Sequence, residues 1–292
     1  MYISVLGEGE DTIVIFPGSG CAGSTVLYRP LAKELAQNNR VIIVEYFGYG
    51  FSDDTYKDRT IQNIVEETRT ALKQVCSEEN YILMPHSISG IYSLYWAIQY
   101  PEEVKAIVGL DMTVAQTENE NNIDWTMFEE KAGVTKEDYY NQSYPLILNP
   151  LVKETGIMRW ANNIYNKDYY EILKSYNLYS KEELQILKKE FNRYPSIAIL
   201  KEYYNKMVYE NINQLQNTNL PKDLPVLHFR ATKPLEVEKE YLGRDTVSII
   251  NKTITNNEIQ KIEIVKGSHE VIYLDAINEI VNKTNKFINN LR

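Results

Sequence analysis

The chain has 292 residues, of which 43% are hydrophobic, and it carries a formal charge of −9 with a pI near 5.1. This length is compatible with one large α/β domain or with a core that holds an insertion. The acidic balance argues against nucleic acid and against an anionic membrane surface as partners, because both would require a basic face.

The cysteines and the N-terminus bear on the compartment. Cys21 and Cys76 are the only cysteines, and two thiols so far apart are no disulfide framework, which suits a reducing compartment. The first apolar run, residues 1–6, breaks at once into Gly-Glu-Gly-Glu-Asp, which is not the pattern of a signal peptide or of a membrane span. We therefore expect a soluble, cytoplasmic protein, although an export segment could have been removed from the chain.

The first part of the chain alternates between strand and helix patterns. The continuous apolar runs Thr12–Phe16 and Arg40–Tyr46 are typical of buried parallel strands, and Tyr28–Gln37 between them has the apolar spacing of a helix. The loop Pro17–Ser24 is rich in small residues, but it lacks the Gly-Lys-Ser/Thr ending of a phosphate loop and the spacing of a dinucleotide loop.

The segment Tyr81–Gly90 indicates chemistry. An apolar strand-like run leads into Ser87, and Gly90 opens the helix-like stretch Ile91–Ile98. A strand, a hard turn and a helix would thrust the Ser87 hydroxyl out of the turn, with the Ile88 amide at the positive N-terminal end of the helix. The pattern therefore predicts a nucleophile, with an ordinary turn serine as the alternative.

This segment resembles the nucleophile elbow of the α/β-hydrolase superfamily, whose pattern is G-x-S-x-G on a strand-turn-helix frame. Pro85 and Ser89 replace the two glycines here, while Gly90 fits the small residue that often follows. A small Ser89 is easily accepted where strand and helix approach closely, and Pro85 can close the strand because its missing N–H needs no partner there.

Two upstream loops fit the same superfamily in the expected order. Pro17-Gly18 stands where the family usually has His-Gly, so the resemblance implies that the N–H of Ser19 joins that of Ile88 in an oxyanion hole. A Gly-rich connecting loop without a role is the alternative. The run at residues 48–52 looks like the family's Gly-x-Gly-x-Ser loop.

The middle of the chain changes character after the strand-like run Val104–Met112. Residues 114–221 are rich in Tyr, Asn, Lys and Glu, and their apolar spacing is helical. The resemblance places a helical cap here, between the two parts of an α/β-hydrolase core at residues 1–113 and 222–292. Such a cap excludes water and shapes the substrate pocket, and its tyrosine pairs are interpreted as packing and rim residues.

The C-terminal part supplies two further strands, Leu224–Phe229 and Ile262–Val265, and a closing helix, Ala276–Leu291. His269 follows the last strand on a Gly-containing loop and matches the family's late catalytic histidine. His228 lies within a strand and is expected to be a core residue with its ring nitrogens satisfied.

The acid that would orient His269 has more than one candidate. The position where many family members carry it falls on Pro234, so it must come from elsewhere. Asp111, at the end of a core strand, is the preferred candidate, since some superfamily members place their acid there. Glu236 is the alternative, and a third possibility is that no acid is used.

These residues imply acyl transfer to water without cofactor or metal. His269 would deprotonate Ser87, which would attack a carboxylic ester through an acyl-enzyme. An aminopeptidase-type amide hydrolase and a non-catalytic small-molecule binding protein are the alternatives. The resemblance does not extend to haloalkane dehalogenases, because their reaction requires a carboxylate where Ser87 stands. The sequence does not predict an oligomeric state.

Overall fold

The computed structural model describes residues 1–21, 23–76, 80–115, 124–133, 135, 167–193, 195–204 and 207–291. Among these residues, seven strands form one sheet in the order β1-β3-β2-β4-β5-β6-β7. β1 pairs antiparallel with β3, and every other neighbouring pair is parallel. The strands are β1 (Tyr2–Leu6), β2 (Thr12–Phe16), β3 (Arg40–Glu45), β4 (Tyr81–Pro85), β5 (Val104–Leu110), β6 (Val226–Ala231) and β7 (Gln260–Val265).

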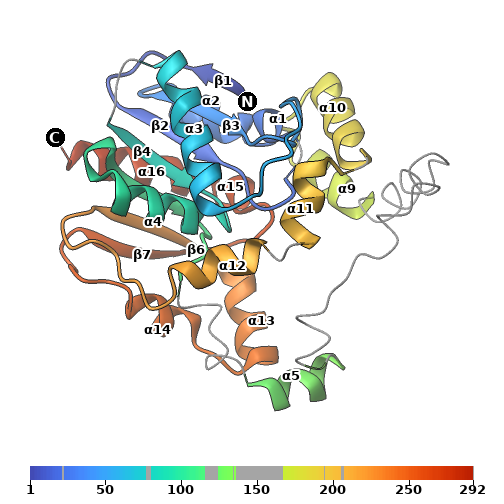
Figure 1. Ribbon diagram of the computed structural model, residues 1–292, viewed down its shortest axis with the longest axis vertical. Helices are drawn as coiled ribbons and strands as arrows, with labels where there is room; N and C mark the ends of the chain where they lie inside the picture. Colours follow the sequence, from blue (N-terminus) through green and yellow to red (C-terminus); the bar gives the residue numbers. More distant parts are fainter. Residues whose placement is uncertain are drawn as a thin grey trace.

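Helices cover both faces of this sheet (Figure 1). The described helices are α1 (Ser24–Leu27), α2 (Arg29–Leu35), α3 (Ile61–Val75), α4 (Ser89–Gln99), the 3₁₀ helix η1 (Pro101–Glu103), α5 (Trp125–Ala132), α9 (Lys167–Ser175), α10 (Lys181–Phe191), α11 (Ile197–Tyr204), α12 (Met207–Gln214), α13 (Thr232–Leu242), α14 (Thr246–Asn251), α15 (Ile272–Asp275) and α16 (Ile277–Asn289). The arrangement is that of a mostly parallel α/β sheet with flanking helices.

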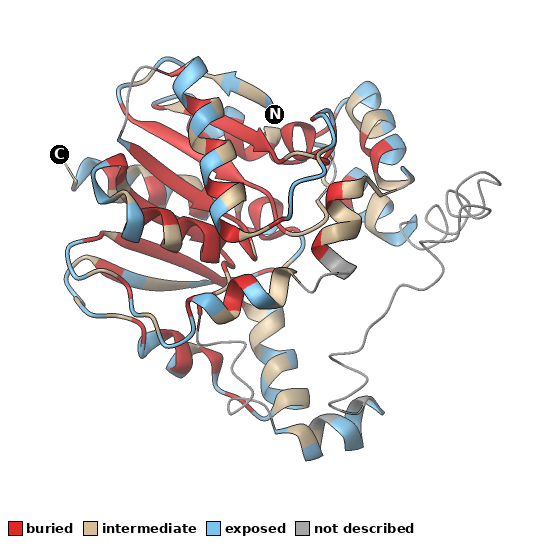
Figure 2. Cartoon of the chain, viewed as in Figure 1, coloured by how far each residue is buried: buried red, intermediate tan, exposed pale blue. Residues whose placement is uncertain are grey.

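The central strands explain why the sheet is covered on both faces. In β2, Val14 and Phe16 belong to the apolar cluster that includes residues of α3 and α4. Ile13 and Ile15 belong to the cluster on the opposite face, with residues of α1, α2, α15 and α16. Because strand side chains alternate, a run that is apolar at every position must be buried from both sides. Each fully buried aliphatic side chain contributes roughly 1.5–3 kcal/mol to folding. Figure 2 shows the central strands buried beneath more exposed helices.

The span 114–221 holds helices wherever its elements are described. α10 packs against α1, α11 packs against α12, and α5 packs against α13 (Figure 1). No helix in the described part of the chain is both long and apolar enough to cross a bilayer.

Two segments differ from the sequence-based expectation. Residues 2–6, which were not predicted as a strand, pair with β3 and form one edge of the sheet. The stretch after β6, for which no helix was predicted, forms helix α13 from Thr232. Pro234 is tolerated in its first turn, because N–H groups there have no intrahelical partner to lose.

Candidate active site

The serine turn joins β4 to α4. β4 ends at Pro85, and the next amide, that of His86, donates to the carbonyl of Phe16 in β2 (3.1 Å). Ser87 follows with φ +53°, in the left-handed region that non-glycine residues seldom occupy. Its carbonyl accepts hydrogen bonds from the amides of Gly90 (3.0 Å) and Thr113 (2.8 Å), which hold the turn. The sequence-based strand, turn and helix are therefore present.

Small residues surround this turn because the backbone segments approach closely. A Cβ at Gly90 would lie 2.5 Å from the Thr113 carbonyl oxygen, and a Cβ at Gly18 would lie 3.2 Å from the Ser87 Cβ. The Ser89 hydroxyl donates to the Pro17 carbonyl and also bonds with the Tyr46 hydroxyl (2.9 Å). Ser89 therefore contributes hydrogen bonds that a glycine could not make.

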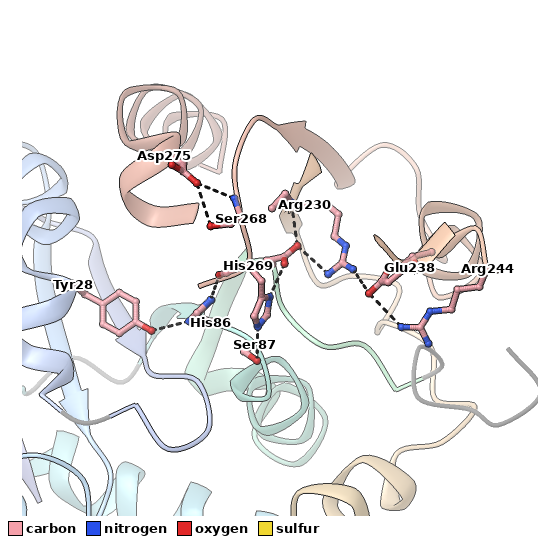
Figure 3. Close-up of polar contacts among 12 residues, drawn as sticks. Tyr28, His86, Ser87, Arg230, Glu238, Arg244, Ser268, His269 and Asp275 are labelled. Carbon is pink, nitrogen blue, oxygen red and sulfur yellow. Dashed lines mark hydrogen bonds and ion pairs between the residues drawn. The ribbon is translucent and has the colours of Figure 1, made fainter. Parts of the chain in front are cut away.

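The structure brings Ser87, His269 and Asp111 together at the carboxyl edge of the sheet. Figure 3 shows the His269 ring directed at Ser87. His269 Nε2 lies 3.0 Å from Ser87 Oγ, and His269 Nδ1 lies 2.6 Å from Asp111 Oδ2. With a neutral imidazole, the serine hydroxyl donates to Nε2 while Nδ1–H donates to the carboxylate. This chain of hydrogen bonds can move a proton from the serine to the histidine.

Asp111 is held from several sides. It follows β5 with φ +45°, and its side chain is fully buried. Oδ1 accepts from the amide of Ala231 (3.0 Å) and lies 2.9 Å from Arg230 Nη1. Burial alone would raise the pKa of this carboxyl, but the hydrogen bond from His269 and the charge of Arg230 outweigh burial and lower the pKa to about 2. Asp111 therefore stays ionised across the ordinary pH range.

A second histidine supports the loop of the first. His86 Nε2 lies 2.7 Å from the backbone carbonyl of His269, and His86 Nδ1 lies 2.8 Å from the Tyr28 hydroxyl. A carbonyl only accepts, so Nε2 carries the proton and the Tyr28 hydroxyl donates to Nδ1. Burial, aided by the electrostatic repulsion that His269 would exert when protonated, lowers the pKa of His86 to about 3, so this ring stays neutral.

The predicted oxyanion loop is tied to α11. The Ser19 hydroxyl donates to Glu202 (3.0 Å), the Tyr49 hydroxyl donates to the same carboxylate (2.7 Å), and the Gly20 amide donates to Tyr49 (2.8 Å). Glu202 is buried, which raises the pKa of its carboxyl. Ile88 immediately precedes α4, at the positive end of that helix.

The sequence matches the family model for the alpha/beta hydrolase fold over residues 11–272. The chain belongs to the alpha/beta hydrolase fold family. This match covers nearly the whole chain and agrees with the sheet and its flanking helices, so the predicted fold is confirmed.

Relatives of this alpha/beta hydrolase cover different shares of it. The uncharacterized protein YbdG of Bacillus subtilis is 28% identical over 291 residues, which is 98% of this chain and 82% of YbdG. A proline iminopeptidase of Saccharolobus solfataricus is 28% identical over 106 residues, or 36% of this chain and 34% of that protein. The solved structure of potato (Solanum tuberosum) epoxide hydrolase I aligns with a TM-score of 0.69 and 17% identity, covering 99% of this chain and 95% of that one. That last likeness shows the fold alone.

The other candidate residues lie apart from this constellation. Glu236 is exposed on α13, whereas His269 Nδ1 bonds with Asp111. His228 is buried in β6, as expected, but the expectation that its ring nitrogens are satisfied is wrong: in the described part of the alpha/beta hydrolase neither nitrogen has a hydrogen-bond partner. Cys21 and Cys76 form no disulfide bond among the described residues. The described residues contain no group of three or more His, Cys, Asp or Glu side chains arranged to hold a metal.

Sequence reasoning missed Arg230, Tyr28 and Glu202. Arg230 had a usable signal, because a charged residue inside an otherwise apolar strand is seldom buried without a partner. Glu202 and Tyr28 had none, since their contacts join parts of the alpha/beta hydrolase that are far apart in the sequence.

Proposed function

We propose that the chain is a serine hydrolase that cleaves carboxylic esters through an acyl-enzyme on Ser87. One observation supports this most directly: an unbroken row of hydrogen-bonding distances runs from Ser87 Oγ through His269 to Asp111, at 3.0 Å and 2.6 Å. His269 takes the serine proton during attack and returns it to the leaving alcohol. Asp111 fixes the imidazole tautomer and stabilises its positive charge.

The amides of Ser19 and Ile88 form the oxyanion hole in this proposal. Two fixed N–H groups stabilise the negative oxygen of the tetrahedral intermediate, and loss of one such donor costs about 10²-fold or more in rate. Water activated by His269 then hydrolyses the acyl-enzyme, which releases the acid and regenerates the serine.

The serine favours acyl chemistry over epoxide opening. Attack of a hydroxyl on an epoxide carbon would leave an alkyl ether on Ser87, and an ether has no carbonyl that activated water can attack. An ester or amide leaves an acyl group, which His269 and water can remove. A cyclic ester also fits this chemistry. A Shewanella oneidensis relative, 28% identical over 108 residues that make up 36% of this chain and 33% of that protein, is named a cis-3-alkyl-4-alkyloxetan-2-one decarboxylase, and an oxetan-2-one is such a cyclic ester.

A fluorophosphonate probe tests the nucleophile. We expect covalent labelling at Ser87, absent in Ser87→Ala and weaker in His269→Ala, with Ser93→Ala as a matched control that labels like the parent. Ser93 is a buried serine of α4, on the helix that follows the turn. A folded sample that does not label would favour the non-catalytic binding protein instead.

Substrate panels then separate the bond types. p-Nitrophenyl esters of increasing chain length report esterase activity and the size of the acyl pocket. Aminoacyl p-nitroanilides test the amide alternative, for which the similarity to a proline iminopeptidase gives a reason. Faster turnover of the anilides than of the esters would replace the ester assignment by the amide one.

A further inference from the structure

Behind Asp111 lies a row of buried charges that the triad does not require. Arg230, at the end of β6, contacts Asp111 Oδ1 with Nη1 (2.9 Å) and Glu238 Oε1 with Nη2 (2.7 Å). Glu238, on α13, also contacts Arg244 Nη2 (3.2 Å) and accepts a hydrogen bond from the Thr246 hydroxyl. Figure 3 shows this row leading from His269 away from the serine. Its charges alternate in sign at every step.

The row is buried, so its charges act on each other with little screening by water. The side chains of Asp111, Arg230 and Arg244 are 0%, 8% and 7% exposed, and that of Glu238 is 18% exposed. A lone buried charge is costly, whereas a row in which each charge has an opposite neighbour is tolerated. Two carboxylates and two guanidinium groups cancel, and the row presents no net charge to His269.

We propose that Arg230 is a positioning residue that sets the charge His269 experiences through Asp111, with Glu238 and Arg244 holding Arg230 in place. This inference rests on the proposed serine-hydrolase chemistry. An isolated carboxylate beside His269 would favour the protonated imidazole, which cannot accept the Ser87 proton. The guanidinium offsets that attraction, so that the imidazole stays an available base at lower pH.

The other groups near His269 do not supply the charge that offsets Asp111. His86 faces it from the serine turn with ring centroids 5.0 Å apart, but that ring is buried and hydrogen-bonded at both nitrogens. Ser87 is uncharged, and Glu270 beside His269 is exposed. His228, also on β6, forms no hydrogen bond with the row among the described residues, and burial lowers its pKa to about 3, so it adds no charge. The guanidinium of Arg230 is thus the cation that the contacts place on Asp111.

Two substitutions of opposite sign test the proposal. Arg230→Met leaves the row with a net negative charge, so the acidic limb of kcat/KM against pH should move up by about one pH unit. Glu238→Gln leaves Arg230 without its neutralising carboxylate, so the limb should move down. Arg230→Lys keeps the charge but loses the two-pronged contact, so the rate should fall while the limb stays in place.

A matched control removes an ion pair elsewhere. Arg69→Met breaks the ion pair between Arg69 on α3 and Glu103 on η1 (2.5 Å). Within the described part of the chain, neither residue of this pair bonds with a residue of the row, so the pH profile of the Arg69→Met variant should equal that of the parent. A purely structural role for Arg230 would lower the rate in Arg230→Met and Glu238→Gln without opposite shifts, and that result overturns the inference. If Arg230→Met fails to fold, the proposal is still tested by the downward shift expected for Glu238→Gln and the unchanged limb expected for Arg230→Lys. If the parent neither labels with fluorophosphonate nor turns over any ester or anilide, it is the proposed function that has failed.

Discussion

Two residues of the candidate site share an unusual backbone conformation. Ser87 and Asp111 have φ values of +53° and +45°, although neither is a glycine. Both follow a buried parallel strand: Ser87 is the second residue after the end of β4, and Asp111 is the first residue after the end of β5. Such strained positions persist only where the surrounding contacts fix them, and they concentrate at functional sites. Here the left-handed turn points both polar side chains at His269 rather than along the sheet.

Asp111→Asn tests the acid. The asparagine amide can present an N–H to His269 Nδ1, which then stabilises the wrong tautomer and removes the base. We expect kcat to fall roughly 10³-fold or more on a p-nitrophenyl ester. Glu236→Gln is the control, because Glu236 is an exposed carboxylate of nearby α13 and its loss should change kcat less than twofold. The reverse pattern would move the acid role to Glu236.

At the scale of elements, α11 is joined to the loop that carries the proposed oxyanion donor Ser19 through Tyr49. The Tyr49 hydroxyl accepts from the Gly20 amide and donates to buried Glu202. Tyr49→Phe removes both hydrogen bonds, so the loop that carries Ser19 loses an anchor. We expect kcat to fall about tenfold with a smaller change in KM, since oxyanion donors act mainly on the transition state.

The control for this substitution is Tyr56→Phe, which removes a hydroxyl from a side chain that is 78% exposed. It should leave both kinetic constants unchanged. If Tyr49→Phe raises KM and leaves kcat intact, the contact between α11 and the loop serves substrate binding and not the oxyanion.

Local sequence patterns were enough to predict the elements around the serine and the histidine. Ser87 and His269 each follow an apolar strand-like run, and this short-range signal needs no knowledge of partners. The ion pair of Arg230 with Asp111 depends on β5 and β6 lying side by side. The local sequence of neither strand indicates which strand will be its neighbour. The helix at 232–242 was not predicted, and Pro234 does not prevent it, because a proline in the first helical turn costs little.

At the scale of the whole molecule, two buried histidines make folding sensitive to acid. Burial is the main cause that lowers the pKa of both His86 and His228 to about 3. In the unfolded chain a histidine gains its proton below about pH 6.5. Between that pH and about 3 the unfolded state binds more protons than the folded state, so the free energy of unfolding falls as the pH falls. Each histidine contributes a slope of up to about 1.4 kcal/mol per pH unit.

His228→Leu separates the two contributions. Both ring nitrogens of His228 lack hydrogen-bond partners within the described residues, so an apolar replacement of similar size should raise the free energy of unfolding at pH 7 by about 1–3 kcal/mol. It should also flatten the fall between pH 6 and pH 4.5 by about 1.4 kcal/mol per pH unit, because one titrating group is gone. Urea unfolding at several pH values measures both effects.

Thr253→Val is the control. It alters the same small cavity without removing a titrating group, so it should keep the parent slope. Equal slopes for His228→Leu and the parent would contradict this prediction. They would mean that folded and unfolded His228 bind a proton equally well, although charging a side chain buried in β6 is energetically costly.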